Sequence, residues 1–374
     1  MAEVHGYCDE RFRPIEEAFQ GFLDSKVDKG ASLAVTLRGE PVVDLWGGTR
    51  DYEERQPWEA DTVVRVFSTS KVILMITVLL LVDRGLLDLD APIVDHWPDF
   101  GRHGKDTMTA RQVLLHQSGL PGFGCTMSMD ELDDWDHVMK VLEDAALWYE
   151  PGTISCYHPQ TYGFILGELT RRVGDLPFDE YVRRELTEPL GADFHLRFRD
   201  DPTRVAALWP AVSDAAFESP MAAAAFGELL ADGEWIDPEY LSSLNPAGSG
   251  ITNARGLARV GSVVACGGEL DGRRYLSRKI VAEAGREQSF ERDEMLGPLR
   301  LGLGFGLDSE DYPASTPTSM HWGGYGGSFL TMDPTSGISC GFAPNQLMIG
   351  EALGDDPRLA TYWRLLGEIS KELA

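Results

Sequence analysis

The apolar run over residues 72–82 constrains the fold of this chain more than any other feature. It carries no charged side chain and predicts a helix that is hydrophobic on all sides and ends near Gly85. This run is too short to cross a bilayer, which takes about 20 apolar residues. Such a helix must therefore lie inside a protein core. The rest of the chain is therefore expected to fold around it.

A Ser-x-x-Lys motif, Ser68 to Lys71, stands directly before this run. Residues three apart on a helix are neighbours, so the serine hydroxyl and the lysine amine can share one proton-transfer site. A serine at its ordinary pKa is a poor nucleophile and needs such a base. The alternative is that Ser68 caps the helix and the lysine follows by chance. The tetrapeptide alone leaves both interpretations open.

Composition narrows the classes of partner. The chain has 374 residues, 43% of them hydrophobic, which is ample for a sizeable core. Its 33 basic and 60 acidic residues give a formal charge of −27, and so acidic a surface repels nucleic acid and anionic membranes. The histidines are dispersed and no His-Glu-x-x-His spacing occurs, so we expect no metal and no cofactor.

The N-terminus and the cysteines bear on location. The first residues have neither the basic nor the apolar region of a signal peptide. Cys8, Cys125, Cys156, Cys266 and Cys340 are scattered without a close pair, which is typical of reduced thiols. We therefore expect a cytoplasmic protein.

Hydrophobic periodicity predicts helix and strand at both ends of the chain and mainly helix between them. This pattern favours an α/β (α+β) fold, with a sheet subdomain formed by residues 1–88 and 250–374 and a helical insertion over residues 89–249. A catalytic site is expected at their junction. The predicted elements are a helix over residues 12–27, hairpin strands over 31–37 and 41–46, helices over 159–173 and 178–190, strands over 302–307 and 328–332, and a helix over 357–373.

Tyr157 follows a Pro-Gly turn and precedes the helix predicted to begin near Gln160. Facing Ser68, this tyrosine can act as a base, either as phenolate or through Lys71. Its ordinary pKa is near ~10, so a phenolate needs a nearby cation, which Lys71 supplies. The alternative is an aromatic side chain packed at a helix start.

A glycine-rich stretch covers residues 321–328 beside a predicted strand. Glycines in such a place let the backbone approach a neighbour closely. Two backbone N–H groups aimed at one oxygen would form an oxyanion hole, worth about 3 kcal/mol per donor. A plain glycine-rich hairpin or bulge is the alternative.

Together these stretches resemble the serine β-lactamase-like hydrolases: class C β-lactamases, DD-peptidases and, most closely, the family VIII esterases. The resemblance implies an antiparallel sheet flanked by helices, with Ser68, Lys71 and Tyr157 as catalytic residues. It also implies a structural role for the signature that contains His116. The similar segments, in the family's order, are residues 67–71, 114–120, 151–157, 250–259 and 322–324.

Two departures from the family's motifs bear on the substrate. The tyrosine motif of β-lactamases is Tyr-x-Asn, whereas Pro159 here offers no side-chain donor. The third motif usually begins with a lysine or histidine that helps to hold a carboxylate, whereas Trp322 stands here, as in family VIII esterases. His321 should not replace that cation, because neighbours on a strand point to opposite faces. An uncharged acyl substrate is therefore favoured over a β-lactam.

The resemblance implies a serine hydrolase that cleaves carboxylic esters through an acyl-enzyme on Ser68. The N–H groups of Ser68 and Tyr325 are the candidate oxyanion donors, and Trp322, Gly323 and Gly324 complete the expected substrate-binding residues. The expected partner is a small-molecule ester or related acyl compound, with no nucleic acid and no membrane, and the oligomeric state is left open. Acyl transfer, amide or peptide hydrolysis and β-lactam hydrolysis remain alternatives at the same site. A non-enzymatic sensor is disfavoured, because all three catalytic residues are present.

Overall fold

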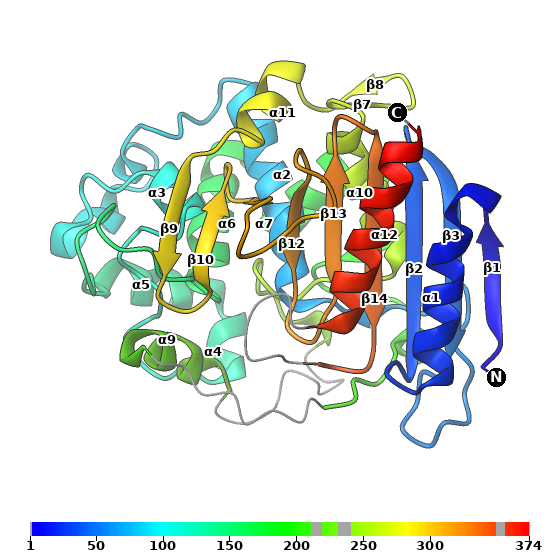
Figure 1. The fold of residues 1–374 in the computed structure, drawn as a ribbon. Coiled ribbons are helices and arrows are strands. Elements are labelled where there is room, and N and C mark those ends of the chain that lie inside the picture. Colours follow the sequence, from blue (N-terminus) through cyan, green and yellow to red (C-terminus); the bar gives the residue numbers. More distant parts are fainter. Residues whose placement is uncertain (1, 211–218, 231–240, 349–355, 374) are drawn as a thin grey trace.

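A computed structural model of the chain describes residues 2–210, 219–230, 241–348 and 356–373, and its centre is a nine-stranded sheet (Figure 1). The strand order is β1-β3-β2-β14-β13-β12-β11-β10-β9, and every neighbouring pair is antiparallel. This sheet and its flanking helices confirm the predicted fold class. The strands are β1 (Val4–Cys8), β2 (Gly30–Leu37), β3 (Glu40–Gly48), β9 (Ser289–Asp293), β10 (Gly297–Leu301), β11 (Gly306–Leu307), β12 (Met320–Gly323), β13 (Phe329–Asp333) and β14 (Ile338–Pro344).

Helices from the two chain ends cover one face of the sheet. They are α1 (Arg13–Asp24) and α12 (Pro357–Leu373), which lie side by side in front of the strands in Figure 1. The apolar stripe of α1 is buried at Ile15, Phe19 and Leu23, and each such side chain stabilises the fold by about 1.5–3 kcal/mol. The predicted first and last helices are thus confirmed.

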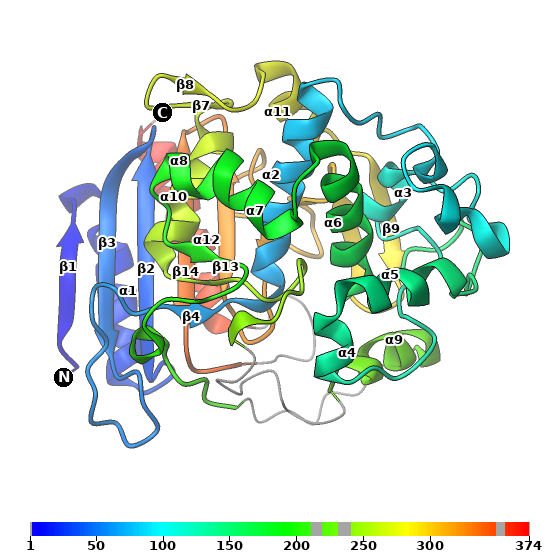
Figure 2. The ribbon, with the colours of Figure 1, turned by 180° about the vertical axis from the view of Figure 1, so that it is seen from behind.

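The opposite face carries α10 (Ala254–Ala265) and α2 (Ser70–Asp83), as Figure 2 shows from behind. Helix α2 is the predicted central helix: residues 70–81 are buried all around it. It packs on one side against α6 (Thr161–Gly174), the predicted helix after the tyrosine loop. Because α2 is enclosed by both the sheet and the helical part of the chain, a residue at its start lies between the two. In the part of the chain that the structure describes, no helix is long and apolar enough to span a membrane.

The remaining element predictions are confirmed except in one place. Strands β2 and β3 form the predicted hairpin, and residues 178–190 are helical throughout, from α7 (Phe178–Val182) through one π-helical turn to α8 (Glu188–Leu190). The strand predicted over 302–307 is wrong for residues 302–305, which form a bend that leaves only β11 extended. Gly304 has φ +85°, a conformation open mainly to glycine, and so interrupts the strand.

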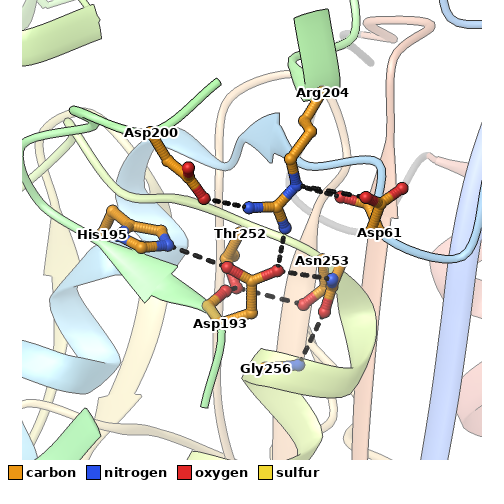
Figure 3. A network of polar contacts seen from close by, with 8 residues as sticks. All are labelled: Asp61, Asp193, His195, Asp200, Arg204, Thr252, Asn253 and Gly256. Carbon is orange, nitrogen blue, oxygen red and sulfur yellow. Dashed lines mark hydrogen bonds and ion pairs between the residues drawn. The ribbon is translucent and has the colours of Figure 1, made fainter. Parts of the chain in front are cut away.

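A second, three-stranded sheet contains the strand that leads into α2. It pairs β4 (Val64–Arg65) with β6 (Ile251–Thr252), and β6 with β5 (Phe194–His195). A polar network beside it has Arg204 at its centre, paired with Asp193, with Asp200 at 2.6 Å and with Asp61 at 3.6 Å (Figure 3). Asp193 also accepts a hydrogen bond from Asn253, whose side chain caps α10. The network therefore ties the segment after β5 both to α10 and to the chain that enters β4.

Candidate active site

Ser68 lies between β4 and α2, in a single 3-10 turn formed by Phe67–Thr69. Its side chain is half-buried, and Phe67 beside it holds a φ of +45°. Such a conformation in a non-glycine residue costs roughly 1–3 kcal/mol and is typical of functional sites. The turn receives no side-chain cap, and the residue at the N-cap position of α2 is Thr69. The interpretation of Ser68 as a helix cap is therefore wrong.

Lys71 lies on the first turn of α2 and is fully buried. Its Nζ atom is 3.1 Å from Ser68 Oγ, 2.9 Å from the carbonyl oxygen of Pro159 and 3.2 Å from that of Ala247. All three partners are uncharged, so none of them compensates a buried ammonium ion. Burial accordingly holds the pKa of Lys71 well below its ordinary value and favours the neutral amine.

Tyr157 reaches the same hydroxyl from the loop before α6. Its phenol oxygen is 2.7 Å from Ser68 Oγ, and Lys71 Nζ lies 4.8 Å from the centre of its ring. Burial raises the pKa of Tyr157, while hydrogen bonds with Ser68 and with the Trp322 indole lower it by less. The expectation that a lysine cation depresses this pKa is therefore wrong, because burial outweighs the effects that lower it. Lys71 is itself driven towards its neutral form. Tyr157 is a phenol, available to donate its proton.

The third motif places Trp322 and His321 on opposite faces of β12, as strand alternation predicts. The Trp322 ring stacks on Tyr157, with 5.9 Å between ring centres and 28° between planes. His321 points to the other face, where its ring lies 4.5 Å from that of Trp363 on α12. The position beside Tyr157 thus holds an uncharged indole.

The glycine-rich loop after β12 lies against the turn that carries Ser68. At Gly324 a Cβ atom would stand 2.1 Å from the Val66 carbonyl oxygen, so only glycine allows this approach. Ser328 Oγ donates to that same oxygen at 2.8 Å, and the Tyr325 ring packs edge-on against Phe67 at 5.5 Å. The structure therefore brings the loop and the serine turn together. The oxyanion role of the Ser68 and Tyr325 N–H groups stays a prediction.

His116 lies behind the tyrosine rather than at the serine. Its ring is fully buried and meets the Tyr157 ring edge at 4.8 Å, and its Nδ1 atom accepts a hydrogen bond from the backbone N–H of His158 at 3.2 Å. The His158 ring in turn lies 2.6 Å from the Ser118 hydroxyl. Burial lowers the pKa of both imidazoles, so both are neutral. These contacts agree with a structural role for the signature around His116.

Three groups at this site were not predicted from the sequence. Two are the carbonyl oxygens of Pro159 and Ala247, which bind Lys71. A main-chain carbonyl occurs at every residue, so no residue type marks it in advance. The third is the buried carboxylate of Asp293, which accepts a hydrogen bond from the Tyr157 N–H at 3.1 Å. It ends a strand outside every motif. No group of three His, Cys, Asp or Glu side chains among the described residues could hold a metal ion.

Comparison with known proteins places this geometry in a family. The sequence profile of the beta-lactamase family matches residues 15–360. The chain belongs to that family. It is similar to "Esterase/beta-lactamase LipL" of Mycobacterium tuberculosis, with 33% identity over 99% of this chain and 89% of that protein.

Two solved structures share the whole architecture. One is a family VIII carboxylesterase, with a TM-score of 0.91 and 32% identity over 100% of both chains. The other is a penicillin-binding protein homologue from Caulobacter crescentus, with a TM-score of 0.90 and 32% identity, also over 100% of both chains. The predicted resemblance to β-lactamase-like hydrolases and family VIII esterases is thereby confirmed.

Proposed function

We propose that this protein is a serine hydrolase that cleaves carboxylic esters through an acyl-enzyme on Ser68. One observation carries the proposal: the Ser68 hydroxyl lies 3.1 Å from a buried lysine and 2.7 Å from a buried tyrosine. A nucleophile within hydrogen-bond reach of its base is the signature of covalent catalysis. The similarity to proteins described as a family VIII carboxylesterase and as an esterase/beta-lactamase supports the choice of ester substrates.

In the acylation step, Lys71 is the base. As a neutral amine it directs its two N–H bonds to the Pro159 and Ala247 carbonyls, which leaves its lone pair for the Ser68 hydroxyl. Ser68 Oγ attacks the ester carbonyl as its proton passes to Lys71. The carbon–oxygen bond to the alcohol then breaks, and Tyr157 protonates the departing oxygen. Lys71 returns its proton to Tyr157, so the pair ends as it began.

Deacylation reverses these roles. Water attacks the Ser68 ester, loses its proton to the Lys71–Tyr157 pair and releases the acid and the serine hydroxyl. In both steps negative charge develops on the carbonyl oxygen, and the N–H groups of Ser68 and Tyr325 are the proposed donors to it. Removing one such donor typically costs 10²–10³-fold in rate, or about 3 kcal/mol.

The surroundings of the triad favour an uncharged acyl substrate. Trp322 stacks on Tyr157 and has no cation to offer a carboxylate, and Pro159 has no side-chain amide to hold an acylamino group.

β-Lactam hydrolysis is the second candidate, because the relative from Mycobacterium tuberculosis is described as both esterase and beta-lactamase. We place it as a weaker activity of the same serine. Acyl transfer and amide hydrolysis differ from ester hydrolysis only in the nucleophile or the leaving group. We also propose that the protein is cytoplasmic.

The test is hydrolysis of p-nitrophenyl acetate and butyrate beside a chromogenic cephalosporin. Wild type should turn over both esters and cleave little cephalosporin, and Ser68→Ala should abolish ester turnover. Ser25→Ala, which removes a hydroxyl at the end of α1, is the matched control and should behave as wild type. Cephalosporin cleavage faster than ester cleavage would contradict the substrate assignment. Ester turnover that survives in Ser68→Ala would contradict the nucleophile.

A further inference from the structure

The loop that carries Tyr157 is fixed by separate hydrogen bonds, from side chains and from the main chain, rather than by secondary structure. Residues 154–158 belong to no helix and no strand, so no ladder of main-chain hydrogen bonds holds them. The last three of their N–H groups nevertheless all have acceptors. Cys156 N–H donates to the His116 carbonyl at 3.0 Å, Tyr157 N–H to Asp293 Oδ1 at 3.1 Å, and His158 N–H to His116 Nδ1 at 3.2 Å. Two residues therefore hold three successive amides.

The Asp293 carboxylate binds both its own turn and the loop that carries Tyr157. It ends β9, is only 1% exposed, and its Oδ1 atom accepts from the N–H groups of Met295 and Leu296 at 2.9 and 3.0 Å. Those two bonds form the usual turn in which an aspartate binds the backbone just ahead of it. Its other contacts cross to the tyrosine loop, since Oδ2 accepts from Ser155 Oγ at 2.9 Å and Oδ1 from Tyr157 N–H.

A buried carboxylate is costly unless several donors surround it. Burial raises the pKa of Asp293, and the hydrogen bonds from Met295, Leu296, Ser155 and Tyr157 each oppose that rise. A shorter polar side chain would complete the turn at less cost, so what the carboxylate adds is its reach to Ser155 and Tyr157.

We propose that Asp293 is a positioning residue, which holds the backbone of Tyr157 so that its phenol meets the Ser68 hydroxyl. His116 restrains the two neighbouring amides. The inference rests on the proposed function, because it presupposes that Tyr157 transfers a proton at Ser68. A displacement of about 1 Å in a proton-transfer group can cost on the order of a hundredfold in rate, so the anchor matters although it touches no substrate.

The chain supplies a matched control in Asp333. It also ends a strand of the large sheet, is 3% exposed, and accepts from the N–H groups two and three residues ahead, on Thr335 and Ser336. Its further partner is the hydroxyl of Thr318, far from the tyrosine loop in sequence. Replacing either aspartate by serine keeps a local acceptor for the turn. Only Asp293→Ser removes the reach to Tyr157.

The assay is hydrolysis of ethyl butyrate, measured as kcat/KM from the butyric acid released, because ethoxide leaves only as Tyr157 protonates it. Ser68 Oγ bonds to the acyl carbon as its proton passes to Lys71, and the bond to the ethyl oxygen breaks as that oxygen takes the Tyr157 proton. Asp293→Ser should lower kcat/KM about tenfold, whereas Asp293→Asn, which keeps an acceptor at the same reach, should stay within about threefold. Asp333→Ser should hydrolyse the ester at the wild-type rate. Thermal melts establish that each variant is folded at the assay temperature.

A double-mutant cycle separates positioning from general support of the fold. In a Tyr157→Phe background the loss from Asp293→Ser should shrink to less than about twofold, because no proton donor remains to be positioned. An equal loss in both backgrounds, or no loss in either, would overturn the inference while leaving the proposed function in place. Absence of Ser68-dependent ester hydrolysis in the wild type would overturn the proposed function, and this inference with it.

Discussion

Replacing His321 by phenylalanine should remove a specific acid sensitivity from this protein. His321 is 1% exposed, and its ring lies 4.5 Å from that of Trp363 and 5.2 Å from that of Tyr312. Burial lowers the pKa of His321 to about 3, and a backbone contact with Leu307 opposes this only in part. In the unfolded chain the same imidazole has a pKa of about 6.5. The unfolded state therefore binds a proton between these two values, and the native state does not.

The sign and size of the effect on stability follow from the difference between the native and unfolded pKa values of His321. Stability rises with pH wherever the unfolded state binds more protons, so the contribution of His321 is intact above about pH 6.5 and is lost as the pH falls below it. From pH 7 to pH 5 the loss amounts to about 2 kcal/mol, since each pKa unit corresponds to about 1.4 kcal/mol. With an unfolding entropy of about 2 cal/mol/K per residue, a chain of this length should lose roughly 2–3 °C in Tm from this group.

The measurement is the Tm of wild type and His321→Phe at pH 7 and pH 5. Any packing cost of the larger ring appears equally at both pH values, so the change in the difference between the two proteins isolates the titration. The variant should gain about 2–3 °C relative to wild type on going to pH 5. His5→Gln, at the sheet edge, controls for loss of an imidazole at the surface. Parallel acid loss in wild type and His321→Phe would refute the reasoning, because it would mean that native His321 takes up its proton as readily as the unfolded chain does.

The remaining predictions concern the catalytic groups. Lys71→Met should lower ester turnover at least about 10³-fold in a protein that thermal melts show to be folded, because it removes the proposed base; near-normal turnover would contradict the base assignment. Tyr157→Phe should lower kcat about 10²–10⁴-fold with a smaller change in KM, and a change confined to KM would point to binding instead. Since Lys71 must be neutral, kcat/KM should fall only as the pH drops through its lowered pKa, and a pH–rate profile that falls already near the ordinary lysine pKa would exclude that role. Trp322→Lys should raise kcat/KM for a p-nitrophenyl hemisuccinate relative to the butyrate, and an unchanged ratio would count against the pocket role.

The sequence predicts those parts of the site that depend on local geometry. Ser68 and Lys71 are three residues apart, and their contact follows from one turn of helix. The opposed directions of His321 and Trp322 follow from strand alternation. In the fold, the hairpin and the two terminal helices carry strong periodic patterns and form as predicted, while the bend at residues 302–305 depends on a single glycine conformation.

The parts that sequence reasoning missed depend on how completely groups are buried. The direction of the Tyr157 pKa reverses the expectation because burial outweighs any effect of Lys71, and burial is set by helices and strands distant in the chain. Asp293 has no periodic pattern around it, and its contact with Tyr157 joins residues 136 positions apart. Such long-range polar contacts are specified by tertiary packing, so local secondary-structure propensity does not predict them.

Burial, rather than the charge of the protein, sets the protonation of this site. The formal charge of −27 would by itself raise the pKa of a lysine, because it favours the ammonium form. Exposed charges are screened over about 8 Å at physiological salt, however, whereas desolvation acts on the amine itself. Lys71 is fully buried, its hydrogen-bond partners are uncharged, and the nearby imidazoles of His116 and His158 are neutral as well. The packing of α2 against the tyrosine loop and α6 therefore favours the neutral amine that the proposed base requires, and changes in the acidic surface should have little effect on it.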